Sequence, residues 1–348
     1  MKRILFVLSV ALLCVTMNVA AHAGYVQNSV SEISFPVTEG VYGAYLSGFD
    51  YAANGNIIAY AGTNVVEVNQ SGTVIQTLYE GAYNSAASFV KVDRSTGKIY
   101  FGESYNGEIR VMNSDGSGQS LLATIANNYD MVIDSAGRLI VSAGSLDWTS
   151  TNLFSLNAAA GDSYQFGSVS GPAGPMALST TGDLYYGVTT FGATSTTHTI
   201  LSWAQSLVDS AITGGEAEAL SGANSTNVLT GDRGISGMAM DEAGHIYYTS
   251  GGNPGGVWKV TDGSRSKMTQ TDPNGYHWLT TLRYNQNAGT VGVAVGNTYD
   301  DSGNPIGVIA NVVAPEPSSL LAFASFGGLA FAMRRRRRAY GESVVDGR

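Results

Sequence analysis

Residues 131–141 read MVIDSAGRLIV, and the same pattern returns as MALSTTGDLYY at 176–186 and as MAMDEAGHIYY at 238–248. In each stretch a short apolar run meets an acid or a hydroxyl residue, a glycine follows three residues later, and an apolar or aromatic run comes next. The acid or hydroxyl side chain can bond the backbone of a tight turn, and glycine readily takes the positive φ that such a turn needs. Each stretch therefore predicts a β-hairpin.

This hairpin pattern recurs along most of the chain. A copy with one extra turn residue, VKVDRSTGKIYF, occupies 90–101, and weaker copies surround the first and last of the anchoring glycines. The six glycines are separated by 42, 40, 45, 62 and 45 residues: Gly55, Gly97, Gly137, Gly182, Gly244 and Gly289. Several copies are followed by a further strand and turn, as at 257–263. Four short strands in about 45 residues, repeated six times, predict a six-bladed β-propeller.

A closed wheel and one insertion follow from this alignment. The strand-like segment 30–37 belongs to none of the hairpins, and we expect it to complete the sixth blade, since an open ring would expose unpaired backbone donors and acceptors. The long spacing places an insertion in the fourth blade, between Tyr186 and Met238, with a short helix at 203–211. Two alternatives stay open at this point: a seven-bladed propeller that uses residues 200–230, and a lectin-like β-sandwich.

The first 23 residues have the pattern of a secretory signal peptide. Lys2 and Arg3 precede an apolar run from residue 4 to about residue 15, and Ala21 and Ala23 match the small-x-small site of signal peptidase. The mature chain should begin at Gly24. The single cysteine, Cys14, lies within this segment, so the mature chain has no thiol for a disulfide or a thiolate metal site.

Residues 313–348 contain three elements in order: the triplet Pro315, Glu316 and Pro317, an apolar stretch at 318–333, and the cluster Arg334, Arg335, Arg336, Arg337 and Arg338. A helix over 318–333 would be about 24 Å long, against a hydrocarbon thickness of about 30 Å, and arginine stems can extend toward the headgroups. The sequence therefore predicts a transmembrane helix. Because cytoplasmic flanks carry the excess of basic residues, the body should lie outside the cell.

This order of motif, apolar span and arginine cluster resembles the PEP-CTERM sorting signal. The resemblance implies that an exosortase cleaves near the Pro-Glu-Pro triplet. It also implies an exported protein that is anchored briefly in the inner membrane and is then displayed on the cell surface or released, often by producers of extracellular polysaccharide.

The body between the two signals, residues 24–312, is predicted to be acidic. Residues 24–314 hold 10 Lys and Arg and 24 Asp and Glu, which gives a net charge of −14. Such a field repels polyanions, so nucleic acid is excluded as a partner. Cations, neutral glycans and other proteins remain.

The repeats over residues 40–312 also resemble NHL-type and gluconolactonase/regucalcin-type six-bladed propellers. The lactonases of that group bind a divalent ion at the axis through Glu, Asn and Asp, so the resemblance implies a candidate calcium site. The candidate ligands, near the starts of inner strands, are Asp50, Asn127, Asn128 and Asp130. The first-blade Glu of such enzymes has no clear counterpart beyond Glu39.

Catalytic motifs are scarce. The mature chain has three histidines without metal-ligand spacing and has neither a Gly-x-Ser-x-Gly elbow nor a His-Glu-x-x-His helix. Aromatic residues in loops would suit a sugar ring, and the candidates are Tyr105, Trp148, His277 and Trp278. We therefore expect an exported binding or scaffold propeller whose partner is extracellular polysaccharide or a surface protein. The alternatives are a metal-dependent lactonase or hydrolase and a protein-binding adhesin.

Overall fold

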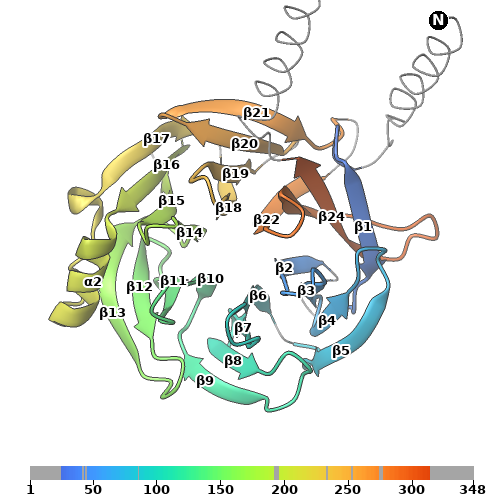
Figure 1. The fold of residues 1–348 in the computed structure, drawn as a ribbon, viewed down its shortest axis with the longest axis horizontal. Coiled ribbons are helices and arrows are strands. Elements are labelled where there is room, and N and C mark those ends of the chain that lie inside the picture. Colours follow the sequence, from blue (N-terminus) through green and yellow to red (C-terminus); the bar gives the residue numbers. More distant parts are fainter. Residues whose placement is uncertain are drawn as a thin grey trace, which may run out of the picture. The chain divides into compact units, whose positions relative to one another are not determined.

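The computed structural model describes residues 25–313, except 41–42, 44, 85, 192–195, 233, 252–253 and 274–276. In this part of the chain, six four-stranded antiparallel sheets are arranged around a common axis (Figure 1). The prediction of an all-β, six-bladed propeller is confirmed. The seven-bladed and sandwich alternatives are wrong, because residues 200–230 supply strands and a helix to the fourth blade and form no blade of their own.

Each blade runs from an innermost to an outermost strand. Blades one to three are built as follows: β2 Leu46–Tyr51, β3 Ile57–Ala61, β4 Asn64–Val68 and β5 Val74–Glu80; β6 Ala87–Val92, β7 Ile99–Glu103, β8 Glu108–Met112 and β9 Ser120–Thr124; β10 Asn128–Ile133, β11 Leu139–Gly144, β12 Ser150–Leu156 and β13 Ser163–Ser170. Blades four to six are built as follows: β14 Met176–Leu178, β15 Leu184–Phe191, β16 Thr196–Trp203 and β17 Thr226–Asp232; β18 Ile235–Met240, β19 Ile246–Ser250, β20 Gly256–Thr261 and β21 Ser264–Gln270; β22 Trp278–Asn285, β23 Thr290–Gly296, β24 Ile306–Val313 and β1 Ser31–Pro36.

The sixth blade joins the two ends of the described body. Its first three strands come from the end of the chain, and its outermost strand, β1, comes from the beginning. β1 pairs antiparallel with β24, from Ser31 opposite Asn311 to Pro36 opposite Ile306. The predicted closure by segment 30–37 is therefore confirmed.

The recurrent turn has the geometry that the sequence predicts. In blade three, Oδ1 of Asp134 accepts the backbone N–H groups of Ala136 and Arg138, each at 2.9 Å. Gly137 follows with a φ of 77°. The other five anchoring glycines also have positive φ, so every blade has a turn glycine in this conformation, with one extra turn residue in blades two and six.

The core lies between neighbouring blades. The second strands of blades one, two, three and five are buried along their whole length, because both faces of the sheet pack against other blades. Tyr60 of β3, for example, meets Phe101 of β7 edge to face, with ring centroids 5.8 Å apart. Further tyrosines of the second strands are also buried, namely Tyr100, Tyr186, Tyr247 and Tyr248, and Tyr185 is half-buried.

The insertion in blade four forms the helix α2, Gln205–Gly214, and the short 3-10 helix η1, Gly222–Asn224. Val208 and Ala211 of α2 are buried in the apolar cluster that also contains Phe166 of β13. Arg138 of the neighbouring blade pairs with Asp209 on the helix. The helix predicted at 203–211 is therefore present, two residues further along.

The predicted signal peptide and sorting signal lie outside the described residues. Within residues 25–313, apart from the gaps given above, the structure contains no helix long and apolar enough to cross a membrane.

Closure can be tested with a core substitution in β1. Phe35 is buried within blade six, in an apolar cluster shared with blade one, and packs over Gly307. Phe35→Ala should lower the free energy of unfolding by about 3 to 5 kcal/mol through lost contacts and a cavity. Ser34→Ala, at the adjacent exposed position of the same strand, should change it by less than about 0.5 kcal/mol. Denaturant unfolding measures the stability of both variants. Equal stability of the two would contradict the conclusion that packing of β1 stabilises the closed propeller.

Candidate binding sites on the propeller axis

Two pockets open on the axis. The loop-face pocket, about 500 Å³, is lined by residues at the starts of inner strands from every blade and by the loops before them. The turn-face pocket, about 540 Å³, is lined by the ends of inner strands and by the recurrent turns. Arg283 of β22 lines both pockets.

Four aromatic side chains stand around the loop-face pocket: Tyr45, Tyr129, Trp278 and Tyr299. They are between 36% and 53% exposed. Tyr129 of blade three reaches across to blade five, where its hydroxyl donates to the carbonyl oxygen of Ser236 at 3.1 Å. Burial of this hydroxyl, with Asp130 beside it, raises the pKa of Tyr129 to about 12. The mouth therefore presents aromatic rings, and the hydroxyl of Tyr129 stays protonated at neutral pH.

The base of this pocket is polar. Asp130 accepts the backbone N–H groups of Met131 and Met176, and its Oδ1 lies 2.8 Å from Nη2 of Arg283. Both side chains of this pair are about 6% exposed. Two buried atoms at the pocket have no hydrogen-bond partner among the described residues, Oγ of Ser47 and Nε of Arg283. Buried polar atoms are normally hydrogen-bonded, so these two atoms are candidates for contact with a ligand.

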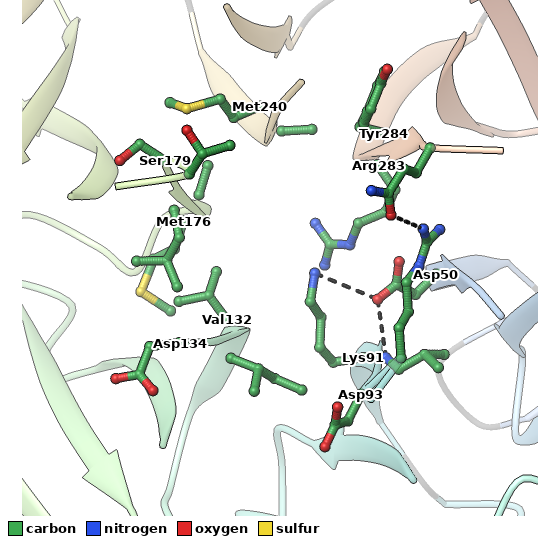
Figure 2. Close-up of a pocket in the computed structure, with 18 of the residues that line it drawn as sticks. Asp50, Lys91, Asp93, Val132, Asp134, Met176, Ser179, Met240, Arg283 and Tyr284 are labelled. Carbon is green, nitrogen blue, oxygen red and sulfur yellow. Dashed lines mark hydrogen bonds and ion pairs between the residues drawn. The ribbon is translucent and has the colours of Figure 1, made fainter. Parts of the chain in front are cut away.

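The turn-face pocket lies on the other side of the Asp130–Arg283 pair. Each blade contributes one equivalent residue to its lining, located two positions before the first residue of the recurrent turn. The six are Asp50, Lys91, Val132, Ala177, Ala239 and Arg283. The charged members come from the adjacent blades six, one and two, and the apolar members from blades three, four and five. Figure 2 shows the basic side chains and Asp50 on one side of this pocket, opposite Val132, Met176 and Met240.

Asp50 ties the first two blades together at the axis. Its carboxylate accepts the backbone N–H groups of Tyr51, at 2.9 Å, and of Val92 in the next blade, at 3.0 Å. Nζ of Lys91 lies 3.4 Å away. Burial alone raises the pKa of Asp50, but the two nearby cations and the two backbone donors outweigh it, so its pKa is lowered. Burial lowers the pKa of Lys91, and Asp50 opposes this change.

The proposed calcium ligands do not fit a cation. The oxygens of Asp50 and Asp130 already accept backbone N–H groups, and each carboxylate is paired with a cationic side chain. Asn128 is buried and donates to the carbonyl oxygens of Glu103 and Ile125. Asn127 lines a separate groove and donates to the carbonyl oxygen of Gly144. Across the described residues, no three His, Cys, Asp or Glu side chains are grouped to hold a metal ion.

The aromatic candidates fall in different places. Trp278 lines the loop-face pocket. His277 supports its rim, because its Nδ1 lies 2.9 Å from the carbonyl oxygen of Asn297 and its ring meets Tyr25 edge to face. Tyr105 and Trp148 are exposed in hairpin turns and do not line this pocket. The four candidates therefore do not form one surface.

Sequence reasoning missed Lys91 and Arg283. Both stand at the same repeat position as Asp50, so an alignment of all six blades residue by residue contains the signal. It was hidden because this position holds an acid, two bases and three apolar residues in the different copies. Arg283 lines the same pocket as Asp50 and Lys91 only because the closed ring places blade six beside blade one.

Comparisons with known proteins identify the fold. No protein-family model matches the chain, and no curated protein matches it. Solved propellers do match it. A gluconolactonase from Xanthomonas campestris is 13% identical, with a TM-score of 0.53 over 79% of this chain and 87% of that one.

Two further solved structures give the same result. The calcium-binding protein regucalcin from Agrobacterium tumefaciens is 14% identical, with a TM-score of 0.53 over 81% of this chain and 96% of that one. A PQQ-bound aldose sugar dehydrogenase from Streptomyces coelicolor is 11% identical, with a TM-score of 0.53 over 82% and 97% of the two chains. At these identities the likeness shows a shared propeller fold.

The axial ion pair predicts a pH dependence of stability. Because the pKa of Asp50 is lower in the folded chain, its contribution is complete above the ordinary pKa of Asp and is lost as the pH falls through the folded value. Asp50→Asn should lower the free energy of unfolding by about 3 kcal/mol at neutral pH, and the difference from the native chain should shrink as the solution is acidified. Denaturant unfolding across a pH series measures this. Asp162→Asn, at an exposed position, is the control, and a difference that is independent of pH would contradict the assignment.

Proposed function

We propose that the protein is an exported binding module whose loop-face pocket holds a small sugar-class ring. The observation that carries this proposal is the ring of four half-exposed aromatics around a base where Ser47 Oγ is buried without a partner. Aromatic faces stack on the C–H faces of sugars, and polar groups at the base bind hydroxyls, which is the usual composition of a small-molecule pocket.

The charge of the body supports a neutral ligand at this pocket. Asp130 and Arg283 compensate each other there, while residues 24–314 carry a net charge of −14. A polyanionic ligand would be repelled by that field. A neutral glycan bears no such cost and uses the aromatic rim directly.

The terminal sequences support a cell-surface or extracellular location. The signal-peptide pattern at 1–23 would send the body across the inner membrane, and the PEP-CTERM-like residues 313–348 would hold it there until an exosortase acts. An extracellular polysaccharide is then the sugar-class partner within reach of the loop-face pocket. A surface protein is the alternative partner, reached through the α2 insertion.

A second candidate function is hydrolysis of a sugar lactone in the same pocket. It is favoured by the fold shared with a gluconolactonase and by an axial pocket of small-molecule size. This alternative is metal-dependent as the sequence predicts it, although no three His, Cys, Asp or Glu side chains are grouped for a metal ion in the described part of the chain. Turnover of glucono-lactone above the spontaneous rate, abolished by a chelator, would favour it over binding alone.

Binding can be tested at the rim of the pocket. Trp278→Ala removes an aromatic face from the mouth and should weaken glycan binding about tenfold, which corresponds to about 1.4 kcal/mol. A glycan array identifies the ligand, and calorimetric titration measures its affinity. Trp148→Ala, an exposed tryptophan away from the pocket, is the matched control. Equal loss of affinity in both variants would exclude the loop-face pocket as the site.

Sorting can be tested at the triplet. Replacing Pro315, Glu316 and Pro317 by alanine should leave the C-terminal tail attached, because the exosortase motif is gone. A tag at the C-terminus and immunoblotting of envelope and medium fractions measure retention of the tail. Glu342→Ala, beyond the arginine cluster, should be processed normally. Loss of the tag from the triple variant at the native rate would refute this assignment.

A further inference from the structure

The turn-face pocket combines a cationic side with an apolar side. Lys91 and Arg283 point into it from blades two and six, and Val132, Met176 and Met240 face them from blades three, four and five (Figure 2). The pocket holds about 540 Å³, which is room for a small molecule. It lies on the opposite face of the wheel from the aromatic mouth and is separated from it by the Asp130–Arg283 pair.

Hydrogen-bond donors outnumber acceptors at its charged side. Each carboxylate there already accepts two backbone N–H groups besides its cation: Asp50 from Tyr51 and Val92, and Asp130 from Met131 and Met176. The ammonium of Lys91 has three N–H donors. Among the described residues it forms an ion pair with Asp50. Nε of Arg283 is buried without an acceptor. The unused capacity is therefore a set of cationic donors.

Acidic side chains at the rim limit what can enter. Asp93, Asp134 and Asp241 line the opening, and each accepts hydrogen bonds within its own turn. Glu242 is a fourth acid there and accepts a hydrogen bond from Gln286. Their charges oppose a compact dianion but cost less against a single negative charge, which the half-buried Lys91 and the buried Arg283 can offset at short range.

From these features we propose that the turn-face pocket is a second binding site, and that it takes a small monocarboxylate with an apolar tail. The carboxylate receives N–H donors from Lys91 and Arg283, and the tail lies against Val132, Met176 and Met240. A charge-assisted pair of donors is the strong form of carboxylate recognition, and burial of the tail supplies the remaining affinity. This inference concerns the other mouth of the axis, although Arg283 lines both pockets, so it is tested without the sugar-class ligand.

The test is titration of the full-length chain with hexanoate, measured by calorimetry and by ligand-observed NMR, with no sugar present. Hexanoate should bind at least tenfold more tightly than 1-hexanol, which has the same tail without the charge. Hexylammonium and inorganic phosphate should neither bind nor compete. Equal binding of hexanoate and hexanol would overturn the carboxylate assignment, and competition by phosphate would overturn the requirement for an apolar tail.

Two variants place the site. Asp50→Asn combined with Lys91→Met removes one cation and its partner together, so that no buried charge is left unpaired, and it should reduce hexanoate affinity at least tenfold. Met240→Asp puts a negative charge on the apolar wall at a partly exposed position and should abolish binding without depending on the core. Lys98→Met, a lysine outside the pocket, is the control. Unchanged affinity in folded Met240→Asp protein would refute the site.

Discussion

The pairing of β1 with β24 is the constraint on which the rest of the protein depends. A propeller of antiparallel blades would otherwise end in an unpaired edge, and its last blade would have no outer strand. By borrowing that strand from the beginning of the chain, blade six comes to lie next to blade one. The axial ring exists only because of this contact, since Arg283 enters it from blade six and Asp50 from blade one.

Closure also makes the axis asymmetric. Blades six, one and two contribute charged side chains at one level, and blades three, four and five contribute apolar side chains at the same level. Hydrogen bonds between neighbouring inner strands hold both halves, from Val92 to Asp50 in the charged half and from Met176 to Asp130 in the apolar half. These carboxylates thus stabilise the contacts between blades, and the same bonds leave them poor ligands for a metal ion. The groups that can contact a ligand are therefore the N–H donors of the cations and the aromatic side chains at the rim of the loop-face pocket.

The repeat was readable because its signal is local. An acid or hydroxyl residue followed by glycine makes the same turn wherever it occurs, as Asp134 and Gly137 do, so blade number, closing strand and helical insertion followed from spacing. The sites were less readable because they combine residues from different blades. Trp278, Tyr105 and Trp148 were all predicted as ligand-facing aromatics because they lie in or beside loops. Trp278 lines the loop-face pocket, whereas Tyr105 and Trp148 are exposed outside it. Asp50 and Asp130 were singled out as acids, and nothing in their own neighbourhoods showed that Lys91 and Arg283 would pair with them.

The sequence by itself determined the repeating hairpin, the count of six and the charge of the body, because these depend on turn chemistry and on the alternation of short apolar runs over a few residues. Only the tertiary structure decided which side chains share the axis, which carboxylates are already occupied and which buried donors are left without an acceptor. The physical reason is distance: a turn is set by atoms three or four residues apart, whereas the pair between Asp130 and Arg283 joins groups 153 residues apart that meet only when the ring closes.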